Sequence, residues 1–142
     1  SQAVRAGNWP PLAQSRGKCM FVLHTQGEHA ELYTQGAPSC EGRPMFMQGT
    51  GDKPYDAVFV INNPMDPQLA ACVEEGFIVR TRADADLKEG HANDTGPRDT
   101  ALARGAHIIS TDFPLGEAHP TTGYAVQLPG GVAARPNPVT AP

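Results

Sequence analysis

Several signals of particular protein classes are missing from this 142-residue sequence. No apolar run reaches the roughly 18–20 residues of a membrane span, and no signal peptide is visible, so we expect no transmembrane segment. The net charge is −4 without a cluster of basic residues, which argues against a nucleic-acid partner. A glycine-rich phosphate loop is absent as well. Glycine and proline, in contrast, are abundant at 15 and 14 residues, and they predict long ordered loops between apolar runs.

The three cysteines form neither a CxxC pair nor a zinc-ligand spacing, which argues against a metal site built on sulfur. Cys19 lies inside an apolar run and is interpreted as a buried free thiol, with a bond to a partner chain as the alternative. Cys40 and Cys72 are candidates for a disulfide, although spacing alone fixes no pairing.

Short apolar runs alternate with helix signals along the whole chain. The runs are rich in β-branched and aromatic residues and do not alternate with polar ones, which is typical of strands buried on both faces of a parallel sheet. Capping residues and prolines begin the intervening helices, and glycines end them. The predicted strands are 19–23, 45–47, 57–61, 77–82 and 107–109; the predicted helices lie within 9–17, 68–75 and 98–104. We also expect an extended stretch over 123–131. This order predicts an α/β domain of parallel βαβ units over residues 1–142.

Two arginines, Arg80 and Arg82, share one face of the predicted strand 77–82. A buried guanidinium without a partner is costly, so each must pair with a carboxylate or face an anion. The planar fork of arginine suits phosphate and carboxylate groups. The sequence leaves both possibilities open: salt bridges to nearby aspartates, or an anionic ligand at the strand ends. The candidate aspartates are Asp84, Asp86 and Asp112.

Three further polar residues follow the ends of predicted strands, where parallel α/β proteins place their chemistry. His24 and Asn62 come after the first and third strands, and Asp112 follows the last one. Asp112 could orient an arginine or a ligand hydroxyl, or it could cap the next segment. His24 is the one histidine with a place for acid–base work, but bond cleavage by acid–base chemistry generally uses two such groups, and the chain offers no second.

The sequence resembles the C-terminal portion of calcium-dependent phosphoinositide-specific phospholipase C proteins, and its last two strands resemble those of glycerophosphodiester phosphodiesterases. The strongest motifs are Val79-Arg80-Thr81-Arg82-Ala83-Asp84-Ala85-Asp86 and Ser110-Thr111-Asp112-Phe113-Pro114. Further matching segments are 16–23, 42–46, 57–60, 93–95, 98–99, 101–103, 105–106, 128–131 and 137–139.

The resemblance implies a (β/α)₈ TIM-type barrel that cleaves a phosphoinositide or related glycerophosphodiester with a histidine pair and Ca²⁺. It also implies that the catalytic histidines and most calcium ligands belong to the first half of the barrel, so no catalytic residue or metal ligand is assigned here. Substrate-binding roles are implied for Arg80, Arg82 and Asp112, with His24 and Asn62 beside them. At position 24 the resemblance implies an acidic residue, and histidine departs from that pattern. A secreted or periplasmic location is the corresponding expectation.

The chain is too short for a whole barrel, which typically needs about 250 residues. We therefore expect the C-terminal half, four to five strands, completed by an N-terminal segment or a partner chain that supplies the rest of the enzyme. Alone, such a half would be inactive and poorly soluble because its edges and apolar interior are open. The alternative is a non-catalytic half-barrel that binds anions or polyol phosphates, with a homodimer closing the barrel.

Overall fold

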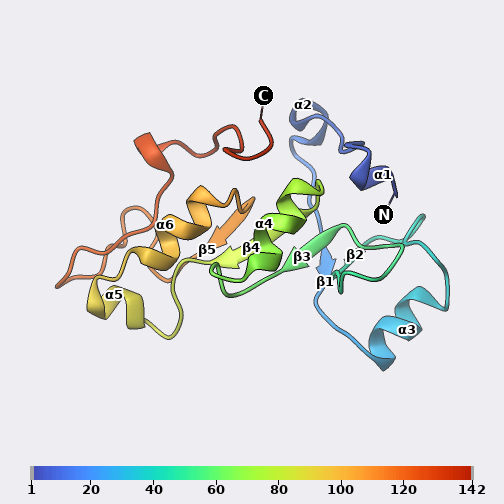
Figure 1. Cartoon of the computed structure of the whole chain (residues 1–142), viewed down its shortest axis with the longest axis horizontal. Helices are drawn as coiled ribbons and strands as arrows, with labels where there is room; N and C mark the ends of the chain where they lie inside the picture. Colours follow the sequence, from blue (N-terminus) through green and yellow to red (C-terminus); the bar gives the residue numbers. More distant parts are fainter. Residues whose placement is uncertain (1, 142) are drawn as a thin grey trace.

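Short parallel β-strands form the frame of the protein, and the computed structural model describes residues 2–141 (Figure 1). In this part of the chain β1 pairs with β2, and β3, β4 and β5 form a second sheet in that order. A parallel bridge between Gln48 and Val58 links the two sheets. The strands are β1 (Val22–Leu23), β2 (Phe46–Met47), β3 (Val58–Val60), β4 (Ile78–Arg82) and β5 (Ile108–Ser110). Each lies within or one residue beyond a predicted strand, so the α/β class with parallel strands is confirmed.

Helices connect the strands and follow the predicted order between β3 and β5. The α-helices are α1 (Gln2–Arg5), α2 (Leu12–Ser15), α3 (Glu28–Thr34), α4 (Pro67–Glu74), α5 (Lys88–Ala92) and α6 (Gly96–Ala103), and η1 (Pro129–Gly131) is a 3₁₀ helix. Sequence patterns predicted α2, α4 and α6. The short helices α1, α3 and α5 were not predicted, and α5 begins and ends at residues with left-handed backbone conformation.

Local sequence explains why α4 forms between β3 and β4. The side chain of Asp66 accepts a hydrogen bond from the backbone nitrogen of Gln68 at 2.9 Å, and Pro67 occupies the first turn. Gly76 adopts φ +86° just beyond the helix, a conformation that favours glycine. The buried side of α4 packs against β4 through Leu69 and Val73, which are both fully buried.

The two faces of β4 have different environments because successive side chains of a strand point to opposite sides. Val79 and Thr81 are 0% exposed on the face that α4 and α6 cover. Arg80 and Arg82 are partly exposed on the other face. Strand register places Arg80 beside Val60 of β3 and Ile108 of β5 on this second face. We call it the open face.

The segment after β5 forms a second apolar cluster with the end of β4. Phe113, Tyr124 and Val126 are buried together with Ala83. The predicted extended stretch 123–131 is only partly found, because it forms a single bridge at Val126 and then the helix η1. Pro129 lacks a backbone N–H and Gly130 has φ +79°, so a longer strand pairing is not available there.

The cysteines do not pair: Cys19, Cys40 and Cys72 are all free. The candidate disulfide between Cys40 and Cys72 is therefore wrong, and Cys19 is exposed rather than buried because β1 begins only at Val22. Cys72 instead packs as a small apolar side chain in α4. Within residues 2–141, no helix is long and apolar enough to cross a membrane.

His107, at the start of β5, predicts a specific loss of stability in acid. Desolvation of the ring lowers the pKa of His107, although the residue as a whole is exposed, and its Nδ1 accepts a hydrogen bond from the backbone nitrogen of Val79 at 3.2 Å. The unfolded state therefore binds more protons below about pH 6.5, so stability is full above that pH and falls as the pH drops toward the folded pKa. Urea midpoints at pH 7.5 and 5 should differ less for His107→Gln than for the wild type. His29→Gln, in an exposed position on α3, should keep the wild-type difference; an equal change in both variants would contradict the role of His107.

Candidate anion-binding site

Arg80 and Arg82 lie on the open face of β4 without an ion pair among residues 2–141, although Asp84, Asp86 and Asp112 line the same hollow. Nη1 of Arg80 donates to Oδ1 of Asn62 at 2.5 Å, a bond to a neutral partner. Burial and the neighbouring charge of Arg82 lower the pKa of Arg80. The side chain of Arg82 forms no hydrogen bond or ion pair with the described residues 2–141. Two neighbouring guanidinium groups without a carboxylate partner favour the binding of an anionic ligand.

The salt-bridge alternative for these arginines is not found within the described part of the chain. Asp86 pairs with Lys88 at 3.2 Å instead. Asp84 accepts hydrogen bonds from the segment after β5, and the backbone nitrogen of Asp112 is one of the donors. Neither arginine appears in an ion pair with any of the three aspartates.

Two adjoining hollows bring the predicted site residues together. One, of about 460 Å³, is lined by His24, Asn62, Arg80 and Arg82 together with apolar side chains of β1 and β3. The other, of about 350 Å³, contains both arginines and Asp112. All five residues therefore line hollows that share Arg80 and Arg82, at the ends of β1, β3, β4 and β5.

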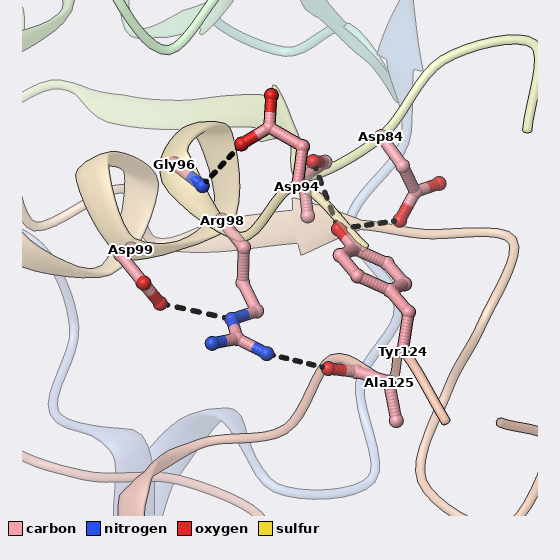
Figure 2. A network of polar contacts seen from close by, with 8 residues as sticks. Asp84, Asp94, Gly96, Arg98, Asp99, Tyr124 and Ala125 are labelled. Carbon is pink, nitrogen blue, oxygen red and sulfur yellow. Dashed lines mark hydrogen bonds and ion pairs between the residues drawn. The ribbon is translucent and has the colours of Figure 1, made fainter. Parts of the chain in front are cut away.

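A buried network holds the end of β5 beside the end of β4. Asp84 is 5% exposed, and its carboxylate accepts hydrogen bonds from Thr111 Oγ1 at 2.5 Å and from the nitrogen of Asp112 at 2.8 Å. The hydroxyl of Tyr124 lies 3.1 Å from the oxygen of Ala83 and 3.4 Å from Oδ2 of Asp84 (Figure 2). Burial, and next the negative charge of Asp84, raise the pKa of Tyr124, so the hydroxyl keeps its proton and donates.

Sequence reasoning missed this structural role of Asp84 and Tyr124. The role of Asp84 follows only from the strand register, in which Arg82 of β4 pairs with Ser110 of β5. Continuing that register by two residues places Asp84 opposite Asp112. Tyr124 left no comparable signal, since it lies 40 residues from Asp84 in the chain.

Arg104 is a second residue that the sequence did not indicate. Its Nη1 donates to the backbone oxygens of Pro64 at 3.1 Å and Asp66 at 2.9 Å. These bonds run from the end of α6 to the loop between β3 and α4. They fix the loop that begins with Asn62, which is the partner of Arg80.

Comparison with known protein families shows which family the chain belongs to. Residues 1–138 match the family model described as phosphoinositide phospholipase C, Ca²⁺-dependent. The chain belongs to this family. No curated protein and no solved structure matches it. The resemblance that the strand-end motifs indicated is thus confirmed over nearly the whole chain, and a phosphoinositide phospholipase C character holds at the level of the family.

This phospholipase C family is described as Ca²⁺-dependent, so we asked whether the oxygen and nitrogen atoms near Arg80 and Arg82 could bind Ca²⁺. Ca²⁺ takes about 6–8 oxygen ligands, largely from carboxylates. No group of three or more His, Cys, Asp or Glu residues that could hold a metal ion is found among residues 2–141. His24 is a nitrogen donor that this hard cation disfavours, and Asp84 is engaged in hydrogen bonds. The described residues do not fit a calcium site by themselves.

Proposed function

We propose that this chain is the phosphate-binding half of a phosphodiesterase that cleaves a phosphoinositide or a related glycerophosphodiester. The observation that carries the proposal is the pair Arg80 and Arg82, which lies at strand ends with no carboxylate partner among residues 2–141. Arginine binds phosphate oxygens in a bidentate manner, and two partly exposed guanidinium groups without a carboxylate in ion-pair contact are free to bind such a ligand. Membership in the phospholipase C family supports the same substrate class.

The proposed architecture is the C-terminal half of a (β/α)₈ barrel. In its support, the strands are parallel and follow each other in chain order, with a bridge between β2 and β3. Within residues 2–141, β1 pairs only with β2, and β5 pairs only with β4. Ile108 on the open face is 46% exposed, whereas an inward side chain of a closed barrel is buried. An N-terminal segment or partner chain with three further strands would complete the eight and cover it.

The residues of this chain would bind and orient the substrate. Arg80 and Arg82 would hold the phosphate and stabilise the negative charge that develops on it, while Asn62 fixes the direction of Arg80. Asp112, on the other side of the same hollow, would accept a hydrogen bond from a polyol hydroxyl.

Acid–base chemistry would come from outside this half. Cleavage of a phosphodiester needs one group to activate the nucleophile and one to protonate the leaving oxygen. His24 is the histidine that lines the arginine hollows, and a second one is missing from their lining. The proposed partner segment therefore supplies the histidine pair, and it supplies the calcium ligands that this chain does not. A secreted or periplasmic location is part of the proposal.

The experiment is purification of the native protein, intact mass measurement of every co-purifying chain, and an assay on phosphatidylinositol vesicles with calcium or a chelator. We expect calcium-dependent hydrolysis from the completed assembly and none from this chain alone. A monomeric, well-folded species of 15.1 kDa would contradict the need for completion. Phosphate binding without turnover in an assembly of two identical chains would instead establish the non-catalytic homodimer.

A further inference from the structure

Asp84 is a buried carboxylate without a cationic partner in the described part of the chain. It forms no ion pair there, although it is 5% exposed at the end of β4. Burial of an unpaired carboxylate costs several kcal/mol unless hydrogen bonds compensate it. Its oxygens accept from Thr111 Oγ1, from the nitrogen of Asp112 and, at 3.4 Å, from the hydroxyl of Tyr124. The two shorter bonds come from the strand end that carries the site.

The contacts of Asp84 fix the backbone at Asp112 rather than a ligand. The bond to the nitrogen of Asp112 is 2.8 Å long and joins residues 28 positions apart. The hydroxyl of Thr111, in turn, accepts from the nitrogen of Phe113 at 2.9 Å. Asp84 thus holds Thr111 and Asp112 directly and Phe113 through the Thr111 hydroxyl. The hydroxyl of Tyr124 lies near the same carboxylate oxygen and blocks its side toward the second apolar cluster.

We infer that Asp84 is a positioning residue that sets the place of the Asp112 carboxylate relative to the guanidinium groups of Arg80 and Arg82. The inference rests on the proposed function, because it assigns hydroxyl recognition to Asp112 and phosphate recognition to the arginines. The arginines belong to β4 and keep their places through the sheet. Asp112 lies beyond the last paired residue of β5 and depends on Asp84. The site then selects a polyol phosphate over inorganic phosphate only while Asp84 keeps these hydrogen bonds.

The test compares the binding of myo-inositol 1-phosphate and inorganic phosphate by calorimetry in the native assembly. Asp84→Asn keeps the shape but removes the charge that strengthens both bonds. We expect it to weaken inositol phosphate binding about tenfold while phosphate binding changes less than twofold. Asp112→Asn should do the same, and the double variant should be no worse than either single one, because coupled residues are not additive. Asp52→Asn, an exposed residue paired with Lys53, is the control and should change neither affinity.

Equal losses for both ligands, unchanged affinities, or additive losses in the double variant would each overturn the positioning role while the proposed function stands. If the wild type binds neither ligand, the proposed function fails. Hydrogen exchange of the backbone amide of Asp112 then tests whether Asp84 holds the Asp112 backbone. Its exchange should be faster by tenfold or more in Asp84→Asn than in the wild type, and unchanged in Asp52→Asn. An equally slow exchange in Asp84→Asn would refute the inference without any ligand. If Asp84→Asn does not fold, Thr111→Val serves in both measurements because it removes one donor only.

Discussion

Replacement of Arg82 by glutamine should lower kcat/KM for phosphodiester hydrolysis by about a hundredfold or more, with little change in the free energy of unfolding. A preorganised donor aimed at developing charge is worth that much in other enzymes. The side chain of Arg82 forms no hydrogen bond or ion pair within residues 2–141, so the substitution breaks no internal polar bond of the side chain. It also removes the repulsion that contributes to the lowered pKa of Arg80. Steady-state kinetics and urea unfolding of the same variant measure the two effects.

The matched control for Arg82 is Arg16→Gln, an exposed arginine beyond α2, which should leave both quantities unchanged. An arginine that only stabilised the fold would, when replaced, lower the free energy of unfolding and leave ligand binding unchanged. Removal of one partner of a buried ion pair costs about 3–5 kcal/mol. A loss of stability of that size, with unchanged phosphate affinity, would show that Arg82 holds the fold rather than a ligand.

The frame that carries the arginines could be predicted from the sequence because its signals are local. Continuous apolar runs indicated β3, β4 and β5, and the pair Asp66-Pro67 indicated the start of α4. The alternation of side chains along β4 then placed Arg80 and Arg82 on one face. Each of these inferences depends on residues a few positions apart, where strand periodicity and capping rules apply.

The details that complete the site depend on contacts between distant residues, and these had no local signal. Arg104 reaches the loop after β3 across about 40 residues, and Tyr124 reaches Asp84 across a similar distance. The sequence also left open whether Arg80 and Arg82 face aspartates or an external anion. Only the register of β4 and β5, together with the bonds of Asp84, decides against the aspartates. Tertiary hydrogen bonding thus distinguishes between two arrangements that the sequence left open.

Truncation of Phe77 to alanine should produce the largest loss of stability, about 3–5 kcal/mol. Phe77 is 2% exposed and precedes β4 in the main apolar cluster. Its ring centroid lies 4.9 Å from that of Phe59, and the guanidinium of Arg5 lies 4.7 Å from the ring. The substitution removes both contacts and leaves a cavity beneath α4. Domains have total stabilities of about 5–15 kcal/mol, so urea unfolding should show a large part of the total lost.

Phe21→Ala is the matched control for this effect, because the same side chain is removed from a position that is 60% exposed. The substitution should lower the free energy of unfolding by less than about 1 kcal/mol, since folding buries little apolar surface of the Phe21 side chain. A small loss in Phe77→Ala would mean that α4 does not close over β4. Arg80 and Arg82 are held on the open face only because the opposite face of β4 is packed in this way. The phosphate affinity of Phe77→Ala should therefore fall with the folded fraction, whereas that of Arg82→Gln should fall while the protein stays folded.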